Sequence, residues 1–211
     1  EIAKKINPSS IKIVGGQHPT LLPEDLSERY IDLICIGPGE DTFREVVLAK
    51  ISGNKFTTVK GLALQNNGQL YFTEERRPQS GVFSWPKLNR GLASKYHRHF
   101  PHGFTVTSIG CPHRCSFCAL WVATRGTYRI RETEETLDDI ASMPNPVIYI
   151  GDDNTFHDHK HAMDICEGLK KRGIKKKYGA YARTDTIVKN RKLFEEWKKI
   201  GLTSLVVGFE V

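Results

Sequence analysis

The stretch Cys111-Pro112-His113-Arg114-Cys115-Ser116-Phe117-Cys118 contains three cysteines with the spacing C-x3-C-x2-C, directly after the strand-like run 103–108. Three thiolates on one short loop can bind three irons of a [4Fe–4S] cluster and leave the fourth iron without a protein ligand. The ring of Phe117 lies next to the last cysteine in the sequence. The spacing therefore predicts Cys111, Cys115 and Cys118 as metal ligands.

Zinc is the alternative metal for the same loop, with His113 or His102 as a fourth ligand. Structural zinc sites normally take four ligands, often from two separated pairs, and no second cysteine pair is present. A disulfide framework is disfavoured because the chain has five cysteines, an odd number, in 211 residues. Cys35 and Cys166 lie in apolar patterns and are predicted to be small core residues.

The loop, with the aromatic Phe117 before its last cysteine, resembles the signature of radical S-adenosylmethionine enzymes. In that family the amino and carboxylate groups of S-adenosylmethionine chelate the open iron. One electron from the reduced cluster then cleaves the sulfonium and yields a 5′-deoxyadenosyl radical. The resemblance implies an enzyme with a [4Fe–4S] cluster and S-adenosylmethionine as cofactors, and an electron donor such as a flavodoxin or ferredoxin.

The composition, with 39 % apolar and 26 % charged residues, is typical of a globular protein of one or two domains. No apolar run approaches membrane-spanning length. Because no segment resembles a secretion signal, and because thiols and an oxygen-sensitive cluster are expected, a cytoplasmic protein is predicted. The net charge is +7. Much of it comes from the runs 170–172 and 175–177, for which a solvated face is expected and an RNA-binding patch is the alternative. Nucleic acid is not expected as a partner.

Two strand-like runs, 11–16 and 31–36, alternate with helical patterns at 23–30 and from Asp41 to Gly53. An alternation of strands and helices predicts a parallel sheet covered by helices. Because the chain opens on Glu1 and stops inside a strand-like run, we expect a fragment of a longer enzyme.

Glycine-rich turns follow both of these strands. The segments Gly15-Gly16-Gln17-His18-Pro19-Thr20 and Gly37-Pro38-Gly39-Glu40 resemble the last two strand ends of the cobalamin-binding domain found before many radical S-adenosylmethionine barrels. Pro38 replaces an acidic residue that is usual there, and no Asp-x-His-x-x-Gly motif is present. The resemblance implies cobalamin as a cofactor, bound by Gly15, Gly16, His18, Gly37, Gly39 and Glu40. A loop histidine without any ligand is the alternative for His18.

Beyond these turns, Asn66-Asn67-Gly68 predicts a hairpin over 58–76, and 77–102 has the composition of a linker. Four further strands are predicted at 103–108, 146–151, 178–183 and 204–211, separated by helical patterns. The predicted fold class is α/β, with three regions. These are the C-terminal part of a Rossmann-like domain (1–55), the hairpin and linker (56–102), and the first four strands of a partial (β/α)6 barrel (103–211).

Ligands of such barrels gather at the carboxyl ends of the strands. By resemblance to the family, the residues implied there for S-adenosylmethionine are Asp152, Asp153, Arg183 and Glu210, together with Phe117 in the loop. Helix capping is the alternative for the two aspartates, and an Arg183–Glu210 ion pair is the alternative for the other two. The segment 157–161, with three histidines, is expected to be solvated.

The leading hypothesis is a cobalamin-dependent radical enzyme that transfers a methyl group to, or otherwise functionalises, an unactivated carbon of a small-molecule or peptide substrate. No catalytic residue is predicted beyond the cofactor ligands. One alternative is a radical methylthiotransferase acting on tRNA or a ribosomal protein, but the three further cysteines of that group are missing upstream. The other is a zinc-stabilised RNA-binding module that is not an enzyme.

Overall fold

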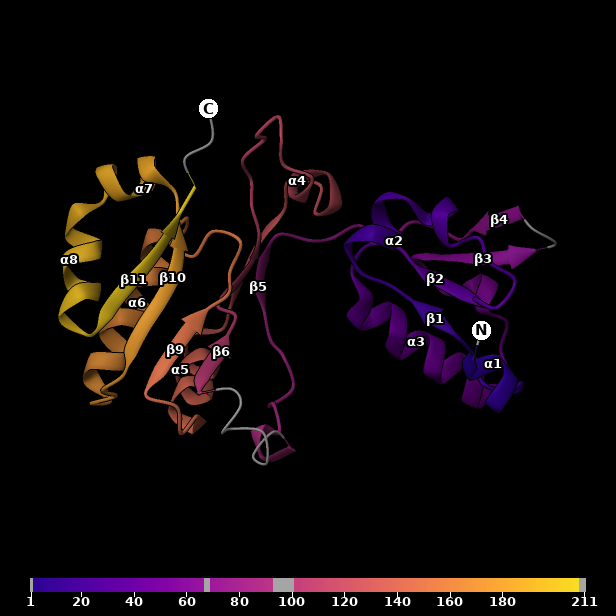
Figure 1. Cartoon of the computed structure of the whole chain (residues 1–211), viewed down its shortest axis with the longest axis horizontal. Coiled ribbons are helices and arrows are strands. Elements are labelled where there is room, and N and C mark those ends of the chain that lie inside the picture. Colours follow the sequence, from indigo (N-terminus) through magenta and orange to yellow (C-terminus); the bar gives the residue numbers. More distant parts are fainter. Residues whose placement is uncertain (1, 67–68, 93–100, 209–211) are drawn as a thin grey trace. The chain divides into compact units, whose positions relative to one another are not determined.

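The computed structural model describes residues 2–66, 69–92 and 101–208 (Figure 1). The chain forms two compact units. The first contains residues up to Gln79 together with 114–126, and the second contains 80–113 and the chain from Thr127 onward.

The first unit is built on a four-stranded sheet with the order β1-β2-β3-β4. Its strands are β1 (Ile13–Val14), β2 (Leu33–Cys35), β3 (Leu62–Asn66) and β4 (Gln69–Phe72). The β1–β2 pair is parallel, as predicted, whereas β3 is antiparallel to both β2 and β4. The hairpin, which the sequence pattern placed with the linker, therefore extends the first sheet. Leu62 and Ala63 are buried there against β2, which accounts for the pairing.

The helical segments of the first unit are α1 (Ile2–Ile6), α2 (Gln17–Leu21), η1 (Pro23–Leu26), α3 (Gly39–Ser52), η2 (Phe56–Thr58) and α4 (Leu120–Ala123). The predicted helix at 23–30 is only the short 3-10 turn η1, and α2 was not predicted. Helix α3 ends as expected at Gly53, which has a φ of 71°. Its apolar residues follow helical spacing, but they do not share a buried face: Val46 is buried, whereas Phe43 and Ile51 are 55 % and 77 % exposed.

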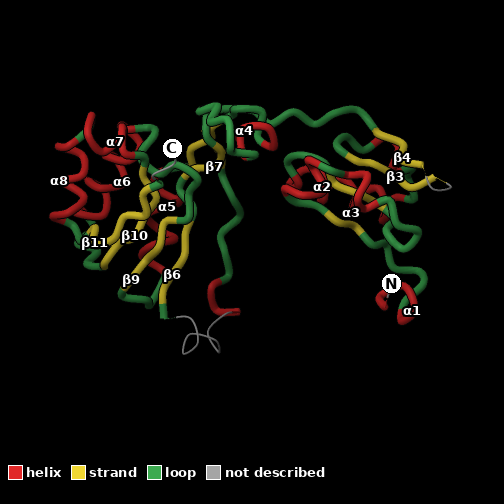
Figure 2. The backbone as a smooth tube through the Cα atoms, turned by 45° about the horizontal axis from the view of Figure 1, so that its top comes forward, coloured by secondary structure: helices red, strands yellow, loops and turns green. Residues whose placement is uncertain are grey.

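The second unit contains a fully parallel sheet with the order β11-β10-β9-β6. Its strands are β6 (His102–Thr105), β9 (Val147–Ile150), β10 (Lys177–Ala182) and β11 (Leu202–Val207). These are the four strands predicted for the barrel. Figures 1 and 2 show the helices of this unit gathered along one face of the sheet. They are α5 (Thr133–Ser142), α6 (His159–Lys171), α7 (Thr184–Lys189) and α8 (Arg191–Lys199).

The core of the second unit lies between this sheet and its helices. In α6 the apolar side chains at i, i+3, i+4 and i+7 spacing are all buried: Ala162, Ile165, Cys166 and Leu169. In α8, Trp197 is fully buried and donates a hydrogen bond from its indole nitrogen to the Ala162 carbonyl oxygen, 2.9 Å away. The opposite face of the sheet exposes apolar side chains, including Phe104 and Tyr181.

A smaller sheet with the order β5-β8-β7 completes the second unit. Its strands are β5 (Gly81–Phe83), β7 (Ser108–Gly110) and β8 (Tyr128–Arg131). The sequence pattern predicted neither β5, which lies in the region of linker composition, nor β8. Arg131 is buried and pairs with the Asp139 carboxylate, which also accepts hydrogen bonds from Arg90. This buried ion network ties the segment after β5 to helix α5.

None of the helices within the described ranges is both long enough and apolar enough to cross a membrane.

Candidate cofactor-binding site

The cysteine loop begins where β7 ends, at Gly110, whose φ is 87°. Cys111, Cys115 and Cys118 form no disulfide within the described part of the chain, and all three are partly exposed. The Cys118 amide donates a hydrogen bond of 3.1 Å to the Cys115 carbonyl, so this part of the loop is a tight turn. Cys111 belongs to the second unit, and Cys115 and Cys118 belong to the first. Among the described residues no three Cys, His, Asp or Glu side chains are gathered into a preformed metal site.

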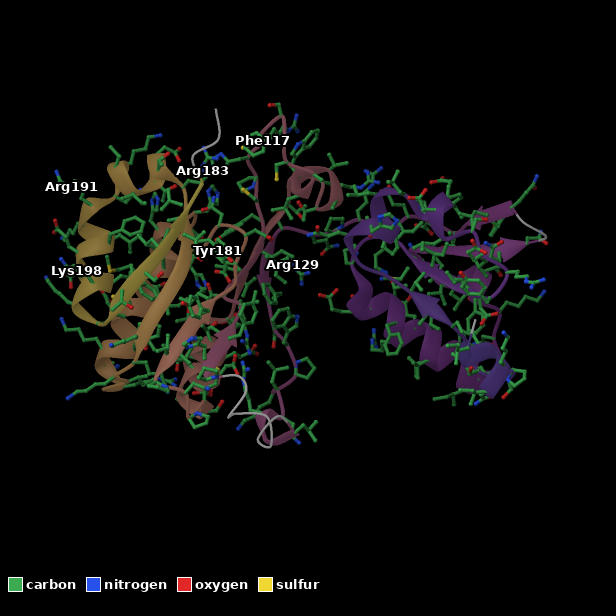
Figure 3. The ribbon with its side chains drawn as sticks, in the orientation of Figure 1. Phe117, Arg129, Tyr181, Arg183, Arg191 and Lys198 are labelled. Atoms are coloured by element: carbon green, nitrogen blue, oxygen red, sulfur yellow. The ribbon has the colours of Figure 1, made fainter. Side chains whose placement is uncertain are left out.

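Phe117 is 65 % exposed, in the turn that precedes α4 (Figure 3). No ring contact holds it among the described residues. The aromatic ring next to the last cysteine is thus available to a ligand of the loop.

Asp152, directly after β9, is buried and points at the chain just before the cysteine loop. Its carboxylate accepts hydrogen bonds from the Thr107 amide (2.6 Å), the Thr107 hydroxyl (2.5 Å) and the Ser108 hydroxyl (2.9 Å). Burial raises the pKa of Asp152 to about 6, although the donated hydrogen bonds oppose the rise. The side chain predicted to contact S-adenosylmethionine is therefore engaged with the protein.

Asp153 is exposed and accepts a hydrogen bond of 2.8 Å from the Gly110 amide. The alternative that these two aspartates cap the next helix is wrong. The residue that caps α6 is Asp158, whose carboxylate accepts from the His161 amide at 2.9 Å. Asp152 and Asp153 instead bind successive parts of residues 107–110, so the second strand end of the barrel fixes the start of the cysteine loop.

Arg183 follows β10 directly, at the position expected for a residue that faces barrel ligands (Figure 3). Its guanidinium donates a hydrogen bond of 3.0 Å to the Asp185 carboxylate. Burial and, after it, the positive charge of Arg183 lower the pKa of His113, a residue of the cysteine loop. Glu210, predicted to lie on the fourth strand, is outside the described residues, and so is its pairing with Arg183.

Asn154 belongs to the run 151–154 at the end of the second barrel strand, where ligands are expected, but no role was predicted for it. Tyr128 and His157 were not predicted as part of the site. Asn154 is buried, and its amide nitrogen lies 3.8 Å from the Cys111 sulfur. The His157 ring packs edge-on against both Tyr128 and His113, with centroids 4.8 and 5.5 Å away. Burial raises the pKa of Tyr128 to about 12. The run of polar residues after β9 was the only sequence signal for this cluster.

The expectation that residues 157–161 are solvated is wrong for His161. This histidine is 3 % exposed, and its Nε2 lies 3.2 Å from the Thr107 carbonyl oxygen. Burial lowers the pKa of His161. Thr107 is thus held from two sides, by Asp152 and by His161.

In the first unit, five of the six residues predicted to bind cobalamin surround one pocket of about 460 Å³. The five are Gly15, Gly16, Gly37, Gly39 and Glu40. Gly16 and Gly37 have φ angles of 118° and 77°, which favour glycine, and Cys35 forms the wall behind Gly15 and Gly39. The structure therefore brings the two glycine-rich turns together.

His18 does not line this pocket. It is exposed, and its Nε2 lies 3.3 Å from the Asp25 carboxylate. Thr20, two residues later, connects the two turns: its hydroxyl donates to the Gly16 carbonyl at 2.7 Å and accepts from the Gly37 amide at 3.0 Å. The threonine of the Gly-Gly-x-His-x-Thr pattern thus has a structural role that spacing alone does not reveal.

A larger pocket of about 650 Å³ also has Gly37 in its wall. Its walls come from the end of β2, from the hairpin, from Arg114 within the cysteine loop, and from residues after that loop, including Trp121 and Arg125. Arg125 forms an ion pair with Glu75, and the Arg114 guanidinium lies 6.0 Å from the centre of the Trp121 ring. Cationic and aromatic groups of the cysteine loop and of the residues that follow it therefore face this space.

The lysine runs lie at the opposite ends of the barrel strands from the site. They line a groove of about 740 Å³ between the start of β10 and the ends of α6 and α8. Residues of this groove include Lys170, Lys175, Lys177 and Lys198. These lysine runs are accordingly separate from the cofactor residues of the second unit.

No protein-family profile matches the chain. Among curated proteins it is 28 % identical over 222 residues to the hopanoid C-3 methylase of Methylococcus capsulatus, covering 99 % of this chain and 41 % of the methylase. It is 25 % identical over 150 residues to the cobalamin-dependent radical SAM methyltransferase TokK of Streptomyces tokunonensis, covering 66 % of this chain and 22 % of TokK.

Among solved structures, the cobalamin-dependent S-adenosylmethionine radical enzyme OxsB, with aqua-cobalamin and S-adenosylmethionine bound, superposes with a TM-score of 0.77. The sequences are 25 % identical, and the match covers 99 % of this chain and 32 % of OxsB. The chain thus spans less than half the length of the relatives that it matches.

These relatives favour the cobalamin-dependent class over the methylthiotransferase and the zinc module. Together with the cysteine loop, the parallel strands and the paired glycine turns, they show that the chain is homologous to cobalamin-dependent radical S-adenosylmethionine enzymes.

Proposed function

We propose that this chain carries the cofactor centre of a cobalamin-dependent radical S-adenosylmethionine enzyme that functionalises an unactivated carbon, by methyl transfer or a related reaction. The observation that carries the proposal is the C-x3-C-x2-C loop, held at its start by carboxylates from the end of a parallel barrel strand. The domains proposed are those predicted from the sequence, with the hairpin joined to the first sheet.

The donor set fits an iron–sulfur cluster. Metal ligation requires thiolates, and the three loop cysteines are partly exposed. Cys35 and Cys166 are buried, and burial raises the pKa of both thiols, to about 11 for Cys166. We propose that Cys111, Cys115 and Cys118 bind the cluster and that binding draws their sulfurs together. A cluster bound there supplies an open iron for the amino acid group of S-adenosylmethionine and the electron that cleaves its sulfonium.

The protein groups around that position have separate roles in the proposal. Arg183 binds the carboxylate of S-adenosylmethionine, because a guanidinium can donate two parallel hydrogen bonds to it. Asp153, Phe117 and Glu210 complete the contacts to this cofactor. Asp152 acts on the loop instead, since its carboxylate oxygens accept from Thr107 and Ser108.

For cobalamin we propose the paired glycine turns, where the backbone can approach a flat, bulky ligand closely. The pocket at Gly15, Gly16, Gly37, Gly39 and Glu40 is smaller than a whole corrinoid, so the ligand extends beyond it. His18 would have to leave Asp25 to contribute a contact.

The substrate is proposed to be a small molecule, because the named relatives include a hopanoid methylase and because the two lysine runs lie away from the site. A flavodoxin or ferredoxin is proposed as the electron donor, and the cytoplasm as the location.

Anaerobic reconstitution of the full chain with iron and sulfide tests the cluster. We expect about four irons per chain, as for a thiolate-bound [4Fe–4S] cluster, and a visible sulfur-to-iron absorbance. Substitution of Cys111, Cys115 or Cys118 by Ala should abolish both signals. Cys35→Ala and Cys166→Ala are the matched controls and should retain them.

Incorporation of a single zinc and no iron by the wild-type chain would exclude the radical enzyme. Retention of a full cluster by Cys115→Ala would show that the ligands are assigned wrongly.

A further inference from the structure

The segment after β9 contacts the cysteine loop at three successive points. Asp153 accepts a hydrogen bond of 2.8 Å from the Gly110 amide, Asn154 approaches the Cys111 sulfur, and the His157 ring packs against His113. Asn154 is the member of this series that reaches a metal ligand directly.

Asn154 is 1 % exposed, and its Nδ2 lies 3.8 Å from the Cys111 Sγ, within range for a hydrogen bond to sulfur. Its Oδ1 is buried without a hydrogen-bond partner among the described residues. A metal-bound thiolate only accepts hydrogen bonds, so the amide must present its nitrogen to the sulfur. In that orientation the Asn154 Oδ1 points away from the sulfur, and it is the atom that lacks a hydrogen-bond partner among the described residues.

The residues on both sides of Asn154 hold it in place. Asp152 is bound to Thr107 and Ser108. Phe156 is fully buried and packs against the Phe194 and Trp197 rings, with centroids 4.6 and 5.6 Å away. The backbone carbonyl oxygen of Asn154 accepts a hydrogen bond of 3.4 Å from the Tyr128 hydroxyl. Because the Asn154 side chain is already fixed in this way, it loses little conformational entropy when it forms a hydrogen bond with the sulfur.

We propose that Asn154 is a positioning residue that orients the Cys111 sulfur and raises the reduction potential of the cluster. The hydrogen bond withdraws electron density from the thiolate and so stabilises the additional negative charge that the cluster acquires on reduction. The inference rests on the proposed function, because it requires a cluster on Cys111.

The test is an anaerobic redox titration of the reconstituted chain, followed by the electron paramagnetic resonance signal of the reduced cluster. Asn154→Leu has nearly the same shape but no donor, and its midpoint potential should shift to more negative values. A tenfold fall in the ratio of reduced to oxidised cluster at one potential is a shift of about 59 mV for a one-electron couple. Asn154→Asp should shift the potential further, since it places a negative charge beside the sulfur.

Thr155→Val is the matched control. Thr155 is the next residue, is 2 % exposed and also has a buried oxygen without a partner among the described residues, but it has no contact with the sulfur there. This variant should assemble the cluster with an unchanged potential.

An unchanged potential in both Asn154 variants overturns the inference while leaving the cluster assignment intact. If the variants assemble no cluster, the unfolding temperature of the iron-free chain distinguishes a role in positioning the sulfur from a merely structural role. A wild-type unfolding temperature supports a role in positioning the sulfur, and a lowered one shows a merely structural role and overturns the inference. Absence of iron from the wild-type chain instead refutes the proposed function.

Discussion

Asp152 combines features that seldom occur together in a stable protein. Its carboxylate is 3 % exposed, no Lys or Arg side chain among the described residues donates to it, and its three hydrogen bonds come from neutral groups on residues 107 and 108. Burial without a counter-charge disfavours the ionised form, and this is why the pKa rises to about 6. Asp152 holds Thr107 and Ser108, just before the cysteine loop, in place. Its ionised form lowers the free energy of unfolding of the chain at neutral pH.

Asp152→Asn should change the pH dependence of folding. The pKa of this carboxyl is about 6 in the folded chain and 3.8 in the reference state, so the folded chain binds more protons between these values. Wild-type stability should therefore fall as pH rises from about 4 to 6, by about 3 kcal/mol relative to Asp152→Asn. Urea unfolding across this pH range measures the difference. Parallel curves for the two proteins would contradict the assignment.

Thr20 provides a second prediction at the scale of one residue. Thr20→Val removes the hydroxyl that joins the Gly16 carbonyl to the Gly37 amide. Loss of two hydrogen bonds of about 1 kcal/mol each should weaken aquacobalamin binding by roughly tenfold or more. Thr20→Ser keeps the hydroxyl and should bind like the wild type. A spectrophotometric titration compares them, and equal affinities for Val and Ser would refute this role.

At the scale of elements, helices α5 and α6 pack closely because α6 has a glycine at the contact. A Cβ at Gly168 would collide with the buried Leu137 side chain. Gly168→Ala should therefore destabilise the second unit by about 1–3 kcal/mol. This cost exceeds the gain of up to about 1 kcal/mol that alanine brings in helix propensity.

A double-mutant cycle isolates that contact. In the Leu137→Ala background the space for the new methyl group is open, so Gly168→Ala should be neutral or stabilising there. Urea unfolding of the four proteins supplies the free energies. The same cost in both backgrounds would mean that the collision with Leu137 is not the cause.

At the scale of the whole molecule, a ligand that binds only the folded chain stabilises it. Aquacobalamin at about 100 times its dissociation constant should add about 2.7 kcal/mol to the free energy of unfolding of the part that binds it. Gly39→Leu should remove this gain, because Gly39 has an ordinary φ and its side chain would fill the glycine pocket. Lys50→Leu adds the same side chain to the same helix away from the pocket, and it should keep the gain. Equal stabilisation of both variants would place cobalamin elsewhere.

Much of the architecture could be predicted because its signals are local in the sequence. Helix α6 has apolar residues at i, i+3, i+4 and i+7, and the barrel strands are short apolar runs between turns. The cysteine spacing and the two glycine turns are also contained in segments of eight residues or fewer. Chemistry that depends on neighbours along the chain, such as an open-iron cluster loop, can therefore be inferred from the order of the residues.

Contacts between distant residues were decided only by the tertiary structure. Thr107 and Asp152 are 45 residues apart, and Gly110 and Asp153 are 43 apart, so no periodicity links them. The burial of His161, the exposure of Phe43 and Ile51, and the pairing of β3 with β2 likewise depend on which surface each element meets. By itself the sequence determined which residues could bind the cofactors. The tertiary structure decided which side chains hold the cysteine loop, because a buried carboxylate or amide takes its partners from whatever the fold brings within hydrogen-bond distance.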